Sequence, residues 1–442
     1  MRTYKNPILY ADYSDPDVVR VGEDYYMVSS SFTYIPGVPL LHSRDLVHWE
    51  LINHCVKKLP FEKYALPCHG SGTWAPSIRY HEGTFFVFIP LVDEGILVAR
   101  SKDPYREFEW NMLCESKGWI DPCPFWDDDG RAYMVFAYAK SRSGIKHRLS
   151  LVEIDPQCRS LLTEPRLIFD GEQIAPTSEG PKMYKRNGYY YILMPSGGVE
   201  TGWQSCLRSR SVYGPYDYRV VMHQGNSRVN GPHQGGWVTS PDGRDWFVHF
   251  QDVVELGRII HLQPMCFLDD WPFIGQDQNG DGIGEPVREW SVPAGERTTG
   301  ERATGERATG EHTTGERTTR KHTAGDHTEG ERAAREDPAG DVPEYAIRQS
   351  DDFEEKTLGL QWQWQANPDA GREDGDFGGI GMVGHDYGYA GLYRMGKGIQ
   401  IRCYRGTVTQ PMFEGEAGEK LVFSQEADRE QAWFRLVLEE DK

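Results

Sequence analysis

A chain of 442 residues is long enough for one large domain and a smaller one, and its net charge of −19 disfavours nucleic acid or an anionic membrane surface as a partner. The 48 glycines, 27 prolines and 12% aromatic residues favour an all-β architecture with many turns. The eight cysteines are scattered without a CxxC pair, which favours free thiols over a disulfide framework. The sequence contains no apolar stretch long enough to span a membrane, and we expect a soluble, cytoplasmic protein.

A unit of roughly 50–60 residues recurs along residues 1–275. In each copy a polar turn with glycine precedes an aromatic strand, at residues 22–26, 82–86, 129–133, 187–190 and 242–246. Such turns, followed by β-branched and aromatic runs, are hairpin signals. One unit per four-stranded blade predicts a five-bladed β-propeller as the catalytic domain, over residues 1–293.

Three acidic residues occupy nearly the same place in three of these units. Asp15 and Asp121 each stand directly before a proline, and Glu179 stands two residues before one. The corresponding segments of the other two units hold Trp74 and His233. Because the first strand of a propeller blade lines the central channel, we expect these side chains to converge on one polar pocket.

Converging carboxylates are the groups that cleave a glycosidic bond. An inverting hydrolase needs one carboxylate to activate water and one carboxylic acid to protonate the leaving oxygen, roughly 6.5–9.5 Å apart. A third negative charge nearby raises the pKa of the acid so that it stays protonated near neutral pH. The alternative for Asp15 and Asp121 is an ordinary Asp-Pro turn. Glu179 lacks that explanation.

The composition changes abruptly after residue 293. Residues 294–342 repeat Gly-Glu-Arg-Thr-Thr and close variants, contain almost nothing apolar, and are predicted to be a low-complexity linker. Globular patterning resumes in residues 343–442, where alternation at 399–402 and an apolar run at 433–438 indicate strands. We expect a partial β-sandwich there, lacking its last members.

A set of short motifs resembles glycoside hydrolase family 43, in particular its β-xylosidase and α-L-arabinofuranosidase members. The motifs are Asn6-Pro7-Ile8-Leu9, Ser14-Asp15-Pro16-Asp17, Trp74-Ala75-Pro76-Ser77, Ser178-Glu179-Gly180-Pro181 and Gly257-Arg258. The resemblance implies a five-bladed propeller and an inverting enzyme. It assigns the general base to Asp15, the general acid to Glu179, and the carboxylate that orients and tunes the acid to Asp121.

The same resemblance assigns four further residues to the sugar pocket. It matches Arg258 to an arginine near the reacting sugar, Phe32 and Trp74 to apolar walls, and His233 to a histidine of the central channel that in some members helps to hold calcium or a water. Structural alternatives stay open for each: a core position for Phe32 or Trp74, a hydrogen-bonded structural role for His233, and an ion pair for Arg258.

We therefore expect an inverting exo-glycosidase that acts on xylo- or arabino-oligosaccharides, with no nucleic-acid or membrane partner. No cofactor is required by this chemistry, and calcium in the central channel is the one metal that the resemblance allows. Residues 277–285 look like the start of a calcium loop, but the twelfth position is Arg288 instead of glutamate, which favours a polar surface turn. The alternative function is a sugar-binding propeller without turnover, because the C-terminal domain is short.

Overall fold

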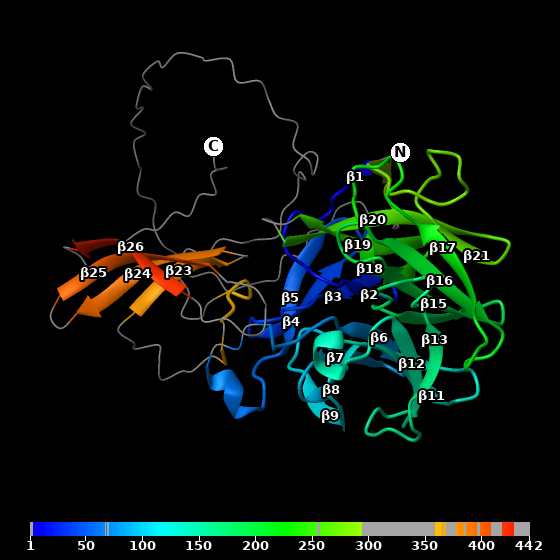
Figure 1. Cartoon of the computed structure of the whole chain (residues 1–442), viewed down its shortest axis with the longest axis horizontal. Helices are drawn as coiled ribbons and strands as arrows, with labels where there is room; N and C mark the ends of the chain where they lie inside the picture. The colour runs from blue at the N-terminus through cyan, green and yellow to red at the C-terminus, as the bar shows by residue number, and fades with distance from the viewer. Residues whose placement is uncertain are drawn as a thin grey trace, which may run out of the picture.

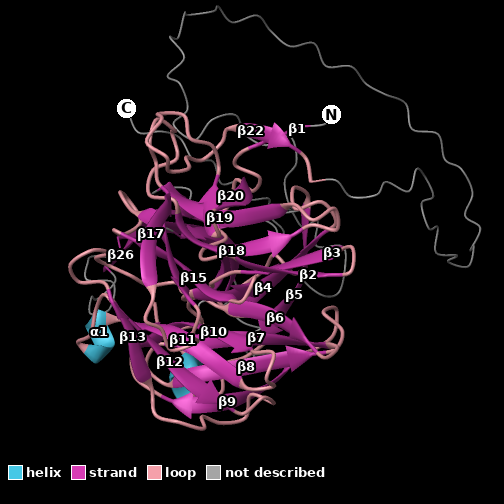
Figure 2. Cartoon of the chain, turned by 90° about the vertical axis from the view of Figure 1, so that its right-hand side faces the viewer, coloured by secondary structure: helices cyan, strands magenta, loops and turns pink. Residues whose placement is uncertain are grey.

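The computed structural model describes residues 3–66, 68, 70–253, 257–293, 359–364, 366–367, 377–383, 386–395, 398–407 and 418–427. Five four-stranded antiparallel sheets form the blades of a propeller, which confirms the predicted fold (Figures 1 and 2). Within each blade the strands pair in chain order, and the first strand lies nearest the axis. The first strands of neighbouring blades contact one another, β2 with β6 and β18, and β10 with β6 and β14, as expected for strands that line a central channel.

Each blade is one contiguous piece of chain. The first blade contains β2 Asp17–Val21, β3 Asp24–Val28, β4 Gly37–Ser43 and β5 Trp49–Val56, and the second contains β6 Ser77–His81, β7 Thr84–Leu91, β8 Gly95–Ser101 and β9 Glu109–Glu115. The third contains β10 Trp119–Trp126, β11 Ala132–Tyr138, β12 Arg148–Ile154 and β13 Arg166–Asp170, and the fourth contains β14 Lys182–Arg186, β15 Tyr189–Ser196, β16 Trp203–Ser209 and β17 Asp217–Met222. The fifth contains β18 His233–Thr239, β19 Asp245–Val253, β20 Gly257–Leu268 and β21 Trp271–Ile274. The five predicted glycine turns all join the first strand of a blade to the second. Helix is confined to η1 Glu62–Ala65 and α1 Lys140–Ser143 in the described part of the chain.

The apolar faces of neighbouring blades pack against each other. One such core joins the first two blades and contains Tyr26 and Phe85, whose ring centres are 4.9 Å apart in an edge-to-face arrangement. Buried aliphatic and aromatic side chains of the alternating strands fill the rest of these interfaces. The hydrophobic effect therefore holds the blades in a ring, because each sheet has an apolar face toward either neighbour.

A proline stands at an equivalent place in every blade, directly before the innermost strand in four blades and within β10 in the third blade. These prolines are Pro16, Pro76, Pro122, Pro181 and Pro232. The residue before the proline has a positive φ in four blades: 55° at Asp15, 56° at Asp121, 56° at Gly180 and 46° at Gly231. Two aspartates thus adopt a backbone conformation that glycine fills elsewhere. Glu179 lies one residue earlier than this position.

The N-terminal segment closes the ring. Strand β1 Thr3–Lys5 pairs with β22 Glu289–Ser291, and Ile8 donates its backbone N–H to the carbonyl of Ile260. The buried Asn6 amide donates to the carbonyls of Leu262 and Val287 and accepts from the N–H of Leu262. The N-terminal segment and the last blade are therefore tied together by backbone pairing and by side chains, which include Tyr4 and Asn6.

The C-terminal region contributes one four-stranded antiparallel sheet, formed by β23 Phe377–Val383, β24 Asp386–Met395, β25 Gly398–Thr407 and β26 Gly418–Ala427. The strand predicted at 399–402 is part of β25. The predicted linker 294–342 and the strand predicted at 433–438 lie outside the described residues. The partial β-sandwich over 343–442 accordingly stays a prediction.

Other expectations can be compared with the described residues. The seven cysteines of the propeller are free thiols, as predicted. In the segment 277–285, residues 278–282 are exposed and the Asp277 carboxylate accepts from the N–H groups of Gly280 and Gly282, as expected for a polar surface turn, while Glu285 at its end is buried. In this part of the chain, no helix has the length and apolar character needed to cross a membrane. The cytoplasmic location stays a prediction.

Asn6→Ala should destabilise the propeller by about 3 kcal/mol, because the buried N–H of Leu262 and carbonyl of Val287 lose the side chain that bonds them, while the Leu262 carbonyl keeps only the Tyr4 hydroxyl. Urea unfolding followed by tryptophan fluorescence measures this loss. Asn226→Ala, at an exposed asparagine, is the matched control and should change the free energy of unfolding by less than about 0.5 kcal/mol. Equal stability of the two variants would show that Asn6 does not secure the closure.

Candidate active site

The carboxylate of Asp15 is buried and held from both sides. The side chain is 2% exposed. Its Oδ2 accepts a hydrogen bond from the Ser30 hydroxyl at 2.6 Å, and its Oδ1 accepts from Arg258 at 3.1 Å. The guanidinium supplies a charge-assisted bond that favours the ionised carboxylate. Asp15 is thus an oriented carboxylate with a lone pair still open on each oxygen.

Asp121 lies across the channel from a different blade, at a bulge in β10. Its Oδ2 accepts from the N–H of Gly180 at 2.6 Å, and the Gln234 side chain also hydrogen-bonds the carboxyl. Burial raises the pKa of Asp121 to about 6, against the lowering effects of the Gly180 N–H and of the positive charge of Lys182. The bond to Gly180 ties Asp121 to the residue that follows Glu179.

Glu179 has the most strongly shifted carboxyl of the three. Burial and then the negative charges of Asp121 and Asp15 raise its pKa to about 8, and Arg258 opposes them only in part. The side chain keeps 27% exposure, so its carboxyl can be reached from solvent. Glu179 is therefore a carboxylic acid at neutral pH, whereas the pKa of the neighbouring Asp121 is raised only to about 6.

His233 lies beside Glu179 as a neutral imidazole. Its Nε2 is 3.3 Å from Glu179 Oε1, without the alignment of a hydrogen bond, and its ring is 5.3 Å from that of Phe250. Burial and the charge of Arg258 lower the pKa of His233 to about 3. Neither ring nitrogen has a hydrogen-bond partner among the described residues. Both nitrogens are buried, and the role of His233 in the sugar pocket stays a prediction.

Arg258, Phe32 and Trp74 line one side of the site. The Arg258 guanidinium carbon lies 5.5 Å from the centre of the Phe32 ring and 4.7 Å from that of Phe250. Burial opposes the charge of Arg258, but the carboxylates of Asp15 and Asp252 outweigh it and raise the pKa. The Phe32 and Trp74 rings meet edge to face at 5.8 Å. All three side chains are partly exposed, as a pocket wall requires.

The loop that carries Phe32 is braced by the C-terminal region. Gln363 donates to the carbonyl of Pro36 at 2.7 Å and to the hydroxyl of Ser31 at 3.3 Å. Trp364 forms a two-way backbone bridge with Ile35. The segment around residue 363 is therefore part of the wall beside Phe32.

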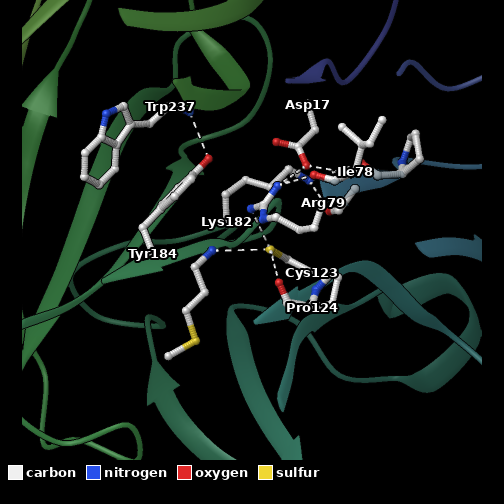
Figure 3. A network of polar contacts seen from close by, with 11 residues as sticks. Asp17, Ile78, Arg79, Cys123, Pro124, Lys182, Tyr184 and Trp237 are labelled. Atoms are coloured by element: carbon white, nitrogen blue, oxygen red, sulfur yellow. Dashed lines mark hydrogen bonds and ion pairs between the residues drawn. The ribbon is translucent and has the colours of Figure 1, made fainter. Parts of the chain in front are cut away.

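A second tier of side chains fills the channel just below the carboxylates. In each blade the residue that directly follows the proline is only 0–1% exposed. These residues are Asp17, Ser77, Cys123, Lys182 and His233. Lys182 donates to the Ser77 hydroxyl at 2.9 Å, and Arg79 bridges Asp17 at 2.7 Å and the Cys123 sulfur at 3.0 Å (Figure 3). Asp17, Ser77, Cys123 and Lys182 thus take part in polar contacts beneath the site, whereas the His233 nitrogens have no hydrogen-bond partner among the described residues.

Sequence reasoning did not single out Ser30, Gln234, Lys182 or Arg79. Ser30 is one of three consecutive serines, so no local signal distinguishes it. For Lys182 a signal existed, because the residue after each X-Pro pair occupies an equivalent place in the channel. The seven residues that the sequence did single out are all brought to this end of the channel or to its wall.

The described residues do not form a calcium cage. Calcium takes six to eight oxygen ligands. His233 offers nitrogen, and no group of three or more His, Cys, Asp or Glu side chains in the described part of the chain is placed to hold a metal. A channel calcium stays a prediction, and no chemical step below is routed through it.

Comparison with known proteins places the fold and the site in a family. Residues 4–272 match the model of glycosyl hydrolases family 43, and the chain belongs to that family. Among curated relatives, a protein of Xylanibacter ruminicola named as a beta-xylosidase is 43% identical over 293 residues, which is 66% of this chain and 54% of the relative. A beta-xylosidase of Formosa agariphila is 30% identical over 83% of this chain and 59% of its own length.

A third relative, a non-reducing end alpha-L-arabinofuranosidase of Bacteroides ovatus, is 31% identical over 62% of this chain and 54% of the relative. The chain therefore spans little more than half the length of the curated relatives it matches. A family 43 protein from Bacillus licheniformis shares the fold with a TM-score of 0.68 at 23% identity, covering 97% of this chain and 84% of that one.

Asp121→Asn should lower the pKa of Glu179 from about 8 toward its ordinary value. Two negative charges raise this pKa, and the charge of Asp121, which the substitution removes, has the larger effect. Carbon-13 NMR of glutamate-labelled protein would follow the titration of the Glu179 carboxyl, assigned with Glu179→Gln. Asp217→Asn, at an exposed aspartate on an outer strand, is the control. An unchanged titration in Asp121→Asn would exclude Asp121 as the source of the shift.

Proposed function

We propose that this chain is an inverting, exo-acting glycosidase that removes xylose or arabinose from xylo- or arabino-oligosaccharides. The observation that carries the proposal is the separation of roles between carboxyl groups. Asp15 is held as a carboxylate by Arg258 and Ser30, while Glu179 is a carboxylic acid with a pKa of about 8. An inverting hydrolase needs this pair of opposite protonation states.

In the proposed reaction, Asp15 accepts a proton from a water molecule, and that water attacks the anomeric carbon. Glu179 gives its proton to the glycosidic oxygen as the bond to the anomeric carbon breaks. Direct attack from the face opposite the leaving group produces the inverted anomer. The reaction consumes one water, and its two proton transfers leave Asp15 protonated and Glu179 ionised until solvent resets them.

The neighbours of these groups support the assignment. Asp121 holds the N–H of Gly180, next to the acid, and its charge keeps Glu179 protonated. Arg258 fixes Asp15 through one guanidinium nitrogen. Phe32 and Trp74 offer partly exposed aromatic surface, which suits the apolar face of a sugar ring.

The names of the relatives support the choice of sugar. They include beta-xylosidases and an alpha-L-arabinofuranosidase that acts at the non-reducing end. A sugar-binding propeller without turnover finds no support in the site, because binding alone gives no reason for a strained aspartate pair and an acid of raised pKa in one pocket.

Asp15→Ala should abolish hydrolysis of both xylobiose and an aryl β-xyloside with a good leaving group, since neither can proceed without activation of water. The loss in kcat should be on the order of 10²–10⁴-fold for a positioned base. Steady-state kinetics with the two substrates would measure it. Substantial activity of the variant on the aryl xyloside would remove Asp15 from the role of base.

Glu179→Ala should separate the two substrates. Xylobiose has a poor leaving group and should lose on the order of 10²–10⁴-fold in rate, whereas an aryl xyloside with an acidic phenol should lose much less. In the unmodified protein, activity on xylobiose should fall as the pH rises through about 8, because Glu179 then loses its proton.

Proton NMR of the first product tests the stereochemical part of the proposal. The nascent sugar should have the inverted configuration. Equal rate losses for the two substrates in Glu179→Ala, or a retained configuration, would contradict the mechanism.

A further inference from the structure

A cavity of about 380 Å³ lies at the end of the channel opposite the candidate active site. The candidate catalytic groups stand beside the prolines, at or near the start of the innermost strands. The cavity is lined by later residues of four of these strands: 79–81 of β6, 124–126 of β10, 183–185 of β14, and 237 and 239 of β18. Because the innermost strands run in the same direction along the axis, the tier of buried channel residues separates the two sites.

Aromatic rings form most of the cavity wall, and neighbouring groups hold them in place. The Tyr184 ring lies between the Arg79 guanidinium, 5.1 Å from its centre, and the Trp237 ring, 5.0 Å away (Figure 3). The Tyr184 hydroxyl accepts from the backbone N–H of Trp237, and the Trp237 indole N–H donates to Asp245 at 2.9 Å. Their orientation is therefore fixed before any ligand arrives.

Trp126, on β10, lines the same cavity. Its ring is stacked on His81 at 4.6 Å with an interplanar angle of 12°, and its indole N–H donates to the carbonyl of Pro156. Trp126, Tyr184 and Trp237 all remain partly exposed, although large aromatic side chains elsewhere in the propeller, such as Trp49 and Trp246, are buried. These three side chains also pack against the cores between blades, but the surface that they leave exposed lines a hollow and can contact a ligand.

The charges of the cavity indicate a neutral ligand. Arg79 is paired with Asp17, and Lys185 is paired with Asp127 and Asp128. An anionic ligand would have to compete with these carboxylates for Arg79 and Lys185. A cationic ligand would have to compete with Arg79 and Lys185 for the same carboxylates. Hydrogen-bonding capacity remains at the rim, where Tyr80 is 39% exposed and carries a hydroxyl.

We propose that this cavity is a second carbohydrate-binding site, which holds a neutral pyranose ring of a xylo-oligosaccharide between Trp126 and Trp237 without cleaving it. A pyranose ring has an apolar face that stacks on an indole and hydroxyl groups at its edge, which matches aromatic walls with a polar rim. The choice of xylose units rests on the proposed function. The site would keep the protein on a long substrate while the opposite end of the channel acts on chain ends.

The test uses the full chain with Glu179→Gln, which slows turnover, and titrates it with xylotetraose to millimolar concentration by calorimetry and ligand-observed NMR. Two binding sites per chain are expected. Adding Trp126→Ala should weaken one of them by about tenfold and leave the other unchanged. Trp110→Ala, at an exposed tryptophan on the outer strand β9, is the matched control and should leave both sites intact.

A single site in the Glu179→Gln protein would overturn the proposal, and this measurement needs no change in the cavity. Two sites that are both insensitive to Trp126→Ala would also overturn it. In the otherwise unmodified protein, Trp126→Ala should leave kcat/KM for an aryl β-xyloside unchanged but reduce retention on insoluble xylan. If the protein hydrolyses xylosides but has only one binding site, the proposed function holds and the second site is contradicted. If a Trp126-dependent site is found without hydrolysis, the second site holds and the proposed function is contradicted.

Discussion

Charge that is removed from water must be compensated, and this requirement organises the channel of the propeller. Asp15 is paired with Arg258, and Asp121 lies in the electrostatic field of Lys182. Glu179 differs, because burial and the charges of Asp121 and Asp15 outweigh the effect of Arg258. A proton on Glu179 resolves the excess of negative charge. The difference between base and acid thus arises from the position of cations, since all three groups are carboxyls.

The proline that recurs at an equivalent place in each blade explains how one repeated unit can place different charges around the channel. Each blade presents the same backbone positions to the axis, but the side chain directly after the proline is aspartate, serine, cysteine, lysine or histidine. The repeat therefore fixes where a group stands, and the individual residue decides its charge. Gly236 shows how tightly the tier is fitted, because a Cβ there would lie 2.7 Å from Asp17 Oδ1. The polar network of Figure 3 depends on such close approaches.

The fold and the three carboxylates could be predicted because their signals are local and repeated. Glycine turns before aromatic strands recur five times, and Asp15, Asp121 and Glu179 recur beside prolines. The partners of these groups could not be predicted, because Ser30 meets Asp15 across a hairpin and Gln234 reaches Asp121 from another blade. Contacts of this kind depend on side-chain direction between elements distant in sequence. The same reason hid the aromatic cavity, whose walls come from four blades.

The contiguity of each blade has a consequence for synthesis of the protein. A blade whose four strands are consecutive can form as soon as it leaves the ribosome, since its contacts are short in sequence. The clasp between β1 and β22 cannot form until nearly three hundred residues have been made. Arg258 joins Asp15 only at that late stage, because it belongs to the last blade. Nascent chains with four finished blades would therefore carry both the acid and the base and still lack an assembled site.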